Sequence, residues 1–407
     1  MLDKNGNRML AYVQEVNKVE DIEGADNIQL AYVLGWTLIV LKNEFKVGDK
    51  CAFFEIDSKV PAGRFFKEDN TDVFAFLERK HYNVKTYKLN KFGVISQGLI
   101  LPLKSFGLDD SLEVGTDLTE TLGVVYSVVE RGKSSGQQSK EQKEKNYMAK
   151  HKFFFSLKIV KWLMKNKGIR KILLARAYSK RIANAYKFPT QYISKSDEER
   201  VQNMPWVLKD DKNTYTATEK VDGTSTTYLL VRKPFRKLEF YVCSRNLRVT
   251  EDDSRIYNGN DNIYWENAKK YNILAVLKHI LKNDKELNWV CIQGESYGEG
   301  WQDNRLKLAG HYFSAFNLID SKRGRWDSIS AREFLINRGY NVPWVPIIAT
   351  GIKLTDFENV KAILEYSNGK SLINPECLRE GIVFRSEKDN PMSFKVVSPE
   401  YLMKHNI

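Results

Sequence analysis

The chain has 407 residues, enough for two or three domains, and its 42% hydrophobic and 28% charged residues are typical of a globular protein. The formal net charge of +13 favours a polyanionic partner, either nucleic acid or an anionic membrane surface. The four cysteines are widely spaced, which argues against a disulfide framework, and neither they nor the five histidines have the spacing of a zinc site. The sequence shows no signal peptide and no long apolar run, which argues against a membrane span. Together these features predict a reducing compartment: the cytoplasm, or the host cytoplasm if the source is viral.

Residues 1–127 are predicted to form a small β-barrel. Short apolar or alternating runs are separated by turns that contain glycine. The predicted strands are 28–32, 37–41, 51–56 and 98–101. We expect an OB-like barrel, a fold that commonly binds nucleic acid, with Trp36, Phe45 and Tyr82 as candidates for stacking on bases. The alternative is a barrel that only packs against its neighbour, with these aromatic residues in its core or rim.

Residues 128–187 are predicted to be a basic linker that contains an amphipathic helix. Between residues 131 and 181 there are 16 Lys and Arg residues against two acidic ones, a net charge of +14. A helix is expected over 153–178, with an apolar stripe beside a lysine stripe. The apolar stripe is Leu157, Val160 and Met164, and the lysine stripe is Lys158, Lys161 and Lys165. Three interpretations stay open: a clamp on nucleic-acid phosphates, a solvated interdomain helix and a helix on an anionic membrane.

Residues 188–407 are predicted to form an α+β domain with a mainly antiparallel sheet. The expected strands are 214–218, 226–231, 238–243, 289–293, 312–318, 381–384 and 393–397. The expected helices are 262–281, 330–338 and 355–366.

A short polar stretch, Lys220-Val221-Asp222-Gly223, follows the first of these strands. Covalent nucleotidyl transfer needs this order, because an amine attacks the α-phosphate and holds the nucleoside monophosphate as a phosphoramide. The aspartate, two residues on, points the same way along an extended chain and can hold a metal-bound water, and the glycine lets the backbone approach the phosphates. The alternative is a strand followed by an ordinary turn, since all three residue types are common at turns.

Further polar or aromatic groups recur along the domain, near predicted strand ends or within strands. They are Arg245, Glu295, Phe316, Glu380 and Lys395, with Glu295 expected just after a strand that ends at Gln293. In chain order, Lys220, Glu295, Phe316, Glu380 and Lys395 resemble motifs I, III, IIIa, IV and V of the covalent nucleotidyltransferases, the superfamily of ligases and capping enzymes.

A narrower resemblance is to the ATP-dependent RNA ligases that carry an OB-fold domain ahead of the catalytic domain. Residues 188–190 and 197–203 are similar to the stretch upstream of the nucleophile in these ligases, and 34–57 is similar to their N-terminal domain. DNA ligases and capping enzymes place an OB domain after motif V. Only 12 residues follow Lys395 here, which is too few for a domain.

The resemblance implies an ATP-grasp-like antiparallel sheet and an enzyme that joins RNA ends in three steps. Lys220 attacks ATP and expels pyrophosphate, AMP moves to a 5′-phosphate, and a 3′-hydroxyl then attacks that phosphate. The implied cofactors are ATP and Mg²⁺ (or Mn²⁺). The implied metal ligands are Asp222, Glu295 and Glu380, and the implied catalytic lysines are Lys220 and Lys395. The implied nucleotide-binding residues are Arg200, Glu219, Arg245, Glu295, Phe316, Glu380 and Lys395, with Arg385 as a further candidate.

Individual roles follow from the same resemblance, and each has an alternative. Arg200 is implied to reach the β- and γ-phosphates, Arg245 the ribose or the RNA end, and Phe316 the adenine ring. Arg200 could instead pair with the neighbouring Glu198 or Glu199, Phe316 could be a core residue, and Glu380 could be a solvated turn acid.

One position departs from the superfamily pattern, and several functions stay open. Motif V usually has two lysines separated by one residue, whereas Lys395 is flanked at those positions by Ser393 and Val397, which leaves Lys404 as a candidate second cation. The alternatives to the ligase are a capping-type guanylyltransferase that loads GTP and a non-catalytic RNA-binding protein. We expect RNA as the partner, in the form of a nicked duplex, a broken loop or free ends. Whether DNA is accepted on one side is an open question. We also expect a monomer that does not contact a membrane.

Overall fold

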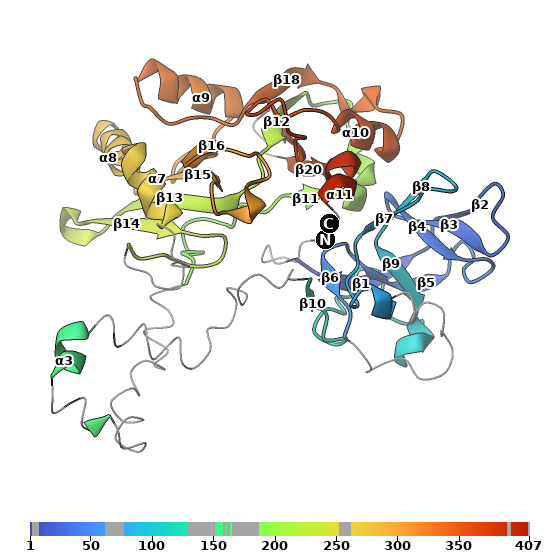
Figure 1. Cartoon of the computed structure of the whole chain (residues 1–407). Helices are drawn as coiled ribbons and strands as arrows, with labels where there is room; N and C mark the ends of the chain where they lie inside the picture. The colour runs from blue at the N-terminus through green and yellow to red at the C-terminus, as the bar shows by residue number, and fades with distance from the viewer. Residues whose placement is uncertain are drawn as a thin grey trace. The chain divides into compact units, whose positions relative to one another are not determined.

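The structure, a computed structural model, describes Met1, residues 8–61, 77–127, 148, 151–157, 160, 163–164, 187–251, 262–388 and 392–405. Its contacts divide the chain into two compact units. Unit 1 comprises Met1–Arg131, Asp197–Lys220 and Pro346–Ile407, and unit 2 comprises Gly132–Ser196 and Val221–Val345. The chain therefore passes from one unit to the other directly after Lys220. The labelled elements are shown in Figure 1.

The first part of unit 1 is a set of short antiparallel strands. One sheet has the order β1–β5–β9, formed by Ala11–Glu15, Lys50–Phe54 and Leu99–Pro102. A second has the order β2–β3–β4, formed by Lys18–Asp21, Ile28–Val33 and Trp36–Leu41. The remaining pairs are β6 with β10 (Ser58–Lys59 and Val125–Tyr126) and β7 with β8 (Thr86–Leu89 and Val94–Gln97).

All four strands predicted for this region are confirmed to within two residues, as β3, β4, β5 and β9. The last begins one residue later than expected because Gly98 has a φ of +118°, outside strand geometry. Strand β1 was missed, since four of its five residues are buried and it lacks the alternation that marks a half-buried strand. Its side chains belong to two apolar clusters, with Tyr12 in one and Ala11 and Val13 in the other.

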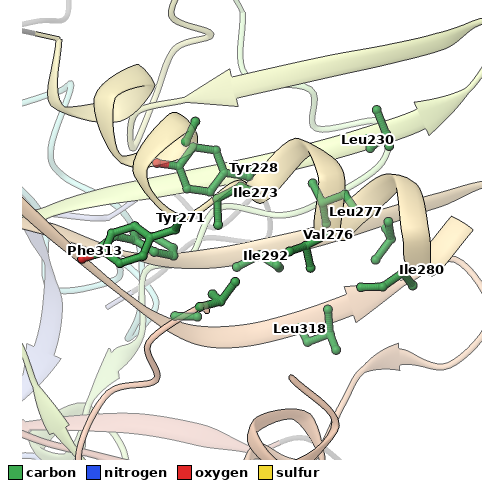
Figure 2. Packing of buried hydrophobic residues seen from close by; sticks show 14 of the residues in the cluster. Tyr228, Leu230, Tyr271, Ile273, Val276, Leu277, Ile280, Ile292, Phe313 and Leu318 are labelled. Carbon is green, nitrogen blue, oxygen red and sulfur yellow. The ribbon is translucent and has the colours of Figure 1, made fainter. Parts of the chain in front are cut away.

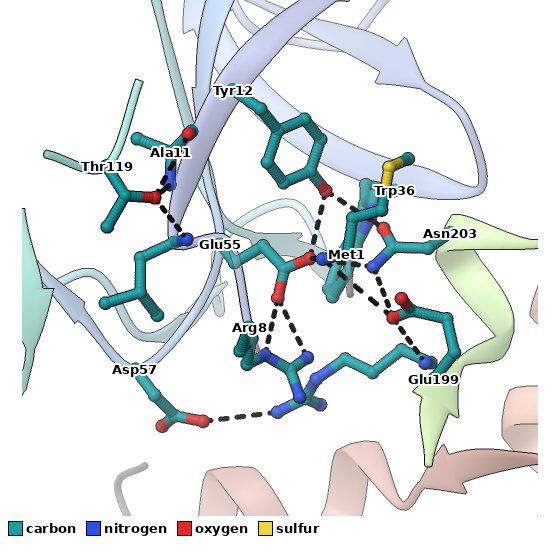
Figure 3. A network of polar contacts seen from close by, with 12 residues as sticks. Met1, Arg8, Ala11, Tyr12, Trp36, Glu55, Asp57, Thr119, Glu199 and Asn203 are labelled. Atoms are coloured by element: carbon teal, nitrogen blue, oxygen red, sulfur yellow. Dashed lines mark hydrogen bonds and ion pairs between the residues drawn. The ribbon is translucent and has the colours of Figure 1, made fainter. Parts of the chain in front are cut away.

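A buried carboxylate joins these strands to the segment Asp197–Lys220 within unit 1. Glu55 is fully buried and accepts hydrogen bonds from Arg8 Nε (2.8 Å), Tyr12 Oη (3.0 Å) and Asn203 Nδ2 (2.7 Å) (Figure 3). The Nε1 atom of Trp36 donates to Asn203 Oδ1 at 2.6 Å. Because a buried carboxylate requires such partners, the network fixes the position of Asn203, and with it the start of the chain that leads to Lys220.

The second sheet of unit 1 has the order β11–β20–β19–β12–β18. These strands are Glu199–Arg200, Ser393–Val397, Gly381–Ser386, Tyr215–Lys220 and Ile347–Ile352. All pairs are antiparallel except β11 with β20, which is parallel. One face packs on an apolar cluster that includes Ala217, Ile382, Phe384, Phe394 and Val396. Strand β18 was not predicted, since none of its residues is buried and its sequence, with a glycine at 351, lacks a strand pattern.

Unit 2 contains the other large sheet, with the order β14–β13–β15–β16–β17. These strands are Leu238–Cys243, Thr224–Arg232, Trp289–Gly298, His311–Asp320 and Gly324–Arg325. Helix α8 (Ile273–Asn283) lays its apolar face on this sheet, where Leu277 and Ile280 pack with Ile292 and Leu318 (Figure 2). The strands expected for one sheet are thus divided between two.

Two predicted helices are each broken. The helix expected over 262–281 is two helices, α7 (Ile263–Lys270) and α8, because Asn272 adopts the left-handed conformation with a φ of +54°. The helix expected over 355–366 is a 3₁₀ turn (Leu354–Asp356) followed by α10 (Val360–Tyr366), which Asn359 caps by accepting from Ala362 N. The third, 330–338, is confirmed as α9 (Ser328–Asn337), and the chain's last described helix is α11 (Pro399–His405).

Only a small part of the predicted basic helix is described. Helix α3 spans Lys152–Ser156, and Leu157 after it is extended, so the described chain does not continue as one helix from 153. Most of 153–178, including Lys158, Lys161 and Lys165, lies outside the described residues. None of the described helices is long and apolar enough to cross a membrane. All four cysteines are described, buried and free, as expected from their spacing.

Candidate active site

Four cations of unit 1 lie on one face of its five-stranded sheet. Register pairs Lys395 with Val383 and with Arg200, and it pairs Lys220 with Gly381. Since alternate residues of a strand point to opposite faces, these side chains lie opposite the apolar cluster. We call this set the cationic face: Arg200, Lys220, Arg385 and Lys395. The sheet therefore brings together four residues that are up to 195 positions apart in the sequence.

Lys220 is the most accessible member of the cationic face. Its side chain is 25% exposed, whereas the other three are at most 9% exposed. Its Nζ donates to Glu380 Oε2 at 2.5 Å. Glu380 directly precedes β19 and is 18% exposed. The amine thus reaches solvent at the end of β12 while a carboxylate holds its position.

Each of the other cations pairs with a carboxylate. Lys395 Nζ donates to Asp197 Oδ1 at 2.8 Å, and Arg385 Nη2 donates to Glu198 Oε1 at 3.2 Å. The guanidinium of Arg200 pairs with Asp57 at 3.2 Å, not with Glu198 or Glu199. Sequence reasoning missed the roles of Asp57, Asp197 and Glu198, because nothing local indicates which of many acidic residues will meet a distant cation.

Burial lowers the pKa values of two cations on this face, Lys395 and Arg200. Burial, and then the Arg8 guanidinium, lowers the pKa of Lys395 to about 7, although Asp197 opposes that shift. Burial likewise lowers the pKa of Arg200. Within the described part of the chain, Nε and Nη1 of Arg200 have no hydrogen-bond partner. These orphaned donors, on a buried side chain, are available to an anionic ligand.

One of the two positions at which the second motif V lysine is missing, Ser393, lies beside Arg385. Ser393 and Arg385 are cross-strand partners in β20 and β19. Glu198 accepts hydrogen bonds from both, from the Ser393 hydroxyl and from the Arg385 guanidinium. The candidate substitute, Lys404, lies exposed on α11. A guanidinium on the neighbouring strand therefore lies next to one of the two positions where the superfamily pattern can have its second lysine.

Glu219 lies on the opposite face of the sheet from Lys220. It pairs in register with Ile382 of the apolar face. Its carboxylate accepts from the Ser371 hydroxyl and from Leu372 N at 2.7 Å. Burial raises its pKa in spite of these bonds. Its predicted place in a nucleotide pocket stays a prediction, and its observed contacts tie β12 to the loop at 371–372.

Unit 2 carries Asp222 and Glu295 at one end of its sheet. Gly223 packs so closely on β15 that an added Cβ would lie 2.5 Å from the Ser296 carbonyl oxygen and 2.9 Å from Glu295 Cγ. Glycine is therefore required here by contact with a strand. Asp222 pairs with Arg305 at 3.5 Å, a residue that the sequence motifs did not indicate.

Glu295 is inside a strand, not after one as predicted. Strand β15 runs to Gly298, five residues beyond the expected end, and Glu295 pairs with Ser225 and Ser314 on its two sides. The run Gly-Glu-Ser-Tyr-Gly has little apolar character, so the sequence pattern stops at 293 while the pairing continues.

Phe316 and Arg245 also lie in unit 2. The register of β15 and β16 slips between Gln293 and Gly294, which leaves Phe316 as the extra residue of a β-bulge. Bulges re-aim side chains and are common next to active sites. Phe316 is half-buried, and Arg245 is exposed in the turn after β14. The bulge could not be predicted, because it depends on pairing between two strands and not on either sequence alone.

The donor chemistry suits a divalent cation, although the described residues hold no group of three His, Cys, Asp or Glu side chains that could bind a metal. Carboxylate oxygens are the ligands that Mg²⁺ and Mn²⁺ prefer. Glu380 and Asp222 each already face a cation, the Lys220 ammonium and the Arg305 guanidinium. These carboxylates therefore fit the predicted metal in charge and donor type.

Comparison with known families assigns both parts of the chain. A family model described as RNA ligase matches residues 213–397, which include Lys220, Glu295, Glu380 and Lys395. A model described as an OB-fold domain matches residues 10–103. No match is found among the curated proteins. The predicted order, an OB-fold ahead of the ligase domain, is confirmed.

Solved structures match over the full length. The Naegleria gruberi RNA ligase with PPi is 29% identical, with 98% of this chain and 99% of that chain covered and a TM-score of 0.71. A point mutant of the same ligase with ATP and Mn is 28% identical, with 98% of both chains covered and a TM-score of 0.70. Another, with AMP and Mn, is 29% identical, with 98% and 99% covered and a TM-score of 0.70. The chain therefore belongs to the RNA ligase family, in the branch that carries an OB-fold domain ahead of the ligase domain.

Proposed function

We propose that this RNA ligase uses ATP to activate a 5′-phosphate through a lysyl-AMP intermediate on Lys220. The observation that carries the proposal is the position of the Lys220 amine, partly exposed at the end of β12 and held 2.5 Å from Glu380. The Naegleria ligase, similar over nearly its whole length, is described in complexes with ATP, AMP and PPi. ATP as the nucleotide follows from that similarity.

In the first step, Lys220 Nζ attacks the α-phosphorus of ATP. The Nζ–P bond forms, the bond from the α-phosphorus to the bridging oxygen breaks, and pyrophosphate leaves. AMP then passes to the 5′-phosphate of RNA, which frees Lys220. Finally a 3′-hydroxyl attacks that 5′-phosphorus, forms the phosphodiester and expels AMP. Such transfers depend on positioning and on neutralising phosphate charge more than on covalent chemistry by the protein.

The cationic face supplies that neutralisation. We assign Lys395 to the α-phosphate, Arg385 to the role of the missing second lysine of motif V, and Arg200, with its orphaned donors, to the β- and γ-phosphates. Anion binding would replace the contacts of these cations with Asp197, Glu198 and Asp57. Phe316 is assigned to adenine and Arg245 to the ribose or the RNA end.

We assign a divalent metal, Mg²⁺ or Mn²⁺, to Asp222, Glu295 and Glu380. When bound, such an ion neutralises charge on the α-phosphate and favours the unprotonated lysine. Two of these carboxylates already face a cation: Glu380 pairs with Lys220, and Asp222 pairs with Arg305.

RNA is the substrate of the family, and we propose RNA ends or nicks as its form here, with DNA tolerance on one side as the open variable. We divide the chain into an OB domain (1–127), a basic linker (128–187) and a catalytic domain (188–407), acting as a monomer. The segment 77–97, which ends in the hairpin β7–β8, supports RNA contact by the OB domain, because it contains five Lys and Arg residues and one acidic residue. Four buried free cysteines support a reducing compartment, and we propose the cytoplasm.

The test is nucleotide loading. Pure protein is incubated with Mg²⁺ and α-labelled ATP, GTP or NAD in parallel, denatured, and examined for label on the chain. Label from ATP alone, absent in Lys220→Ala, is the expected result. Label from GTP would instead indicate capping-type chemistry, and no label from any donor on AMP-free protein would indicate a non-catalytic RNA-binding protein.

A further inference from the structure

The turn between β13 and β14 has an unusual composition for a hairpin. Lys233 N donates to Lys237 O at 2.7 Å and closes the turn, so the tip is Pro234-Phe235-Arg236. Phe235 is fully exposed and adopts the left-handed conformation, with φ +59° and ψ +29°.

Closure of the hairpin does not explain why a phenylalanine occupies this position. Turns that need a positive φ ordinarily use Gly, Asn or Asp, which reach that conformation at little cost. A bulky aromatic residue at positive φ is an outlier, and a fully exposed phenylalanine gains no burial in return. Because local rules are broken mainly at functional sites, the tip of this hairpin is a candidate contact surface.

The charge around Phe235 indicates the chemistry of the partner. Between β13 and β14 the chain has three cations and no acid: Lys233, Arg236 and Lys237. The nearest acid in sequence, Glu239, is already paired with Lys233 and Arg248. An exposed aromatic ring among cations matches single-stranded or unpaired nucleic acid, in which bases stack on rings and phosphates meet Lys and Arg.

The tip is far from the residues of motif I along its own strand. Strand β13 begins at Thr224, beside Asp222 and Gly223, and ends at Arg232. Eight residue steps of about 3.3 Å separate its ends by roughly 26 Å. At about 3.4 Å per nucleotide, this corresponds to on the order of eight nucleotides.

We propose that Phe235 stacks on a base of the RNA substrate several nucleotides away from the joined ends, while the cations of the turn contact the neighbouring phosphates. The proposal rests on the RNA ligase function and adds a remote contact that distinguishes long substrates from short ones. Phe235 acts in RNA binding only and takes no part in lysine adenylation.

The test compares Phe235→Ala and Phe235→Trp with the unchanged protein on two RNA substrates, with arms of about 4 and about 20 nucleotides on each side of the join. Phe235→Ala should weaken binding of the long substrate about tenfold, which is within the range for loss of one base–aromatic stack, and should leave the short substrate unaffected. Phe235→Trp should retain long-substrate binding. AMP loading without RNA should be unchanged in all three proteins.

Two controls keep the result interpretable. Ile336→Ala removes another exposed apolar side chain of unit 2, on α9, and should alter neither substrate. Lys237→Glu keeps Phe235 in place and should weaken long-substrate binding with a smaller salt dependence, which tests the surface even if Phe235→Ala folds poorly.

Equal binding of the long substrate by Phe235→Ala and the unchanged protein would overturn the proposal, and so would an equal loss on both substrates. Loss of binding to anionic vesicles, with RNA binding intact, would identify the tip as a membrane contact instead and would also overturn it. Failure of AMP loading in the unchanged protein would contradict the proposed function and leave the RNA-binding comparison standing by itself.

Discussion

Lys220 Nζ lies 2.5 Å from Glu380 Oε2 because β12 and β19 are paired in a single antiparallel register. Lys220 is the last residue of β12 and pairs with Gly381, the first residue of β19, which Glu380 precedes. Gly381 packs so closely on β20 that a Cβ would lie 2.2 Å from the Val396 carbonyl oxygen. The glycine after the acid is thus part of how the sheet presents the acid to the lysine.

Removal of this carboxylate should impair the first chemical step. Glu380→Gln keeps the size of the side chain but not its charge, so the Lys220 amine loses its ionic partner and the proposed metal loses a ligand. We expect AMP loading to fall by about 10²-fold or more, as for loss of a single catalytic electrostatic contact. The measurement is the initial rate of label transfer from ATP. As a control, Glu376→Gln changes an exposed acid of the same region and should load normally.

Arg385 should act as the second cation of motif V. Arg385→Ala should slow AMP loading, because one positive charge on the cationic face is lost, whereas Lys404→Ala on α11 should load at the normal rate. Rescue makes the test specific. Adding Ser393→Lys to Arg385→Ala restores the two-lysine pattern and should recover part of the lost rate. If AMP loading is slowed in Lys404→Ala and not in Arg385→Ala, Arg385 does not replace the missing lysine of motif V.

ATP binding should take up a proton at mildly alkaline pH. Burial and the Arg8 guanidinium hold the pKa of Lys395 at about 7, so at pH 8 this lysine is mostly neutral in the free protein. A bound phosphate favours the charged form and raises the pKa, so affinity should fall up to about tenfold for each pH unit above 7. Calorimetry in two buffers of different ionisation enthalpy measures the uptake. We expect about one proton for the unchanged protein and a clearly smaller value for Lys395→Met.

Glu55 should govern acid stability. Burial opposes its ionisation, but Arg8 and the N-terminal ammonium outweigh burial and lower its pKa from 4.5 to about 2. A lowered carboxyl pKa contributes stability that is complete above 4.5 and is lost as the pH falls toward 2. Glu55→Gln leaves the buried Arg8 without its closest counter-charge, with Asp197 at 3.9 Å as the remaining one, and we expect the free energy of unfolding at pH 7 to fall by about 3–5 kcal/mol.

The pH profile separates this effect from a general packing defect. The difference in unfolding free energy between the unchanged protein and Glu55→Gln should shrink as the pH is lowered from 4.5 to 2, because the native carboxylate is then protonated. A difference independent of pH would mean that the cost is steric. Glu15→Gln, at the exposed last residue of β1, should be close to neutral throughout.

The basic linker can be tested by its salt dependence. Replacement of Lys158, Lys161 and Lys165 by Gln should weaken RNA binding and reduce the slope of log affinity against log salt by about 2–3, if each lysine contacts one phosphate. The matched control replaces three exposed lysines on and after α8, which are Lys278, Lys282 and Lys285. An unchanged slope would favour a solvated helix, and lost binding to anionic vesicles alone would favour the membrane interpretation.

The sequence predicted those features of the site that depend on order along the chain. The lysine–aspartate–glycine stretch, the later motifs and the OB domain placed in front were all evident in one pass. In the folded sheet, strand alternation places Lys395 and Arg385 on the face opposite their apolar neighbours Phe394 and Phe384.

What the sequence could not predict depends on pairing between distant segments. The bulge at Phe316 arises from a register slip against β15, and the contacts of Asp197, Glu198 and Arg305 need the folded chain. The break at Asn272 is a single left-handed residue inside an otherwise helical pattern, for which asparagine is only permissive.

The central claim is that Lys220 carries AMP. The most direct test is to incubate the protein with ATP and Mg²⁺, digest it under conditions that preserve phosphoramides, and locate the AMP by peptide mass spectrometry. The account predicts one modified residue, Lys220, and no modification in Lys220→Ala. AMP on any other residue, or no AMP on a protein that still joins RNA ends with ATP, would contradict it.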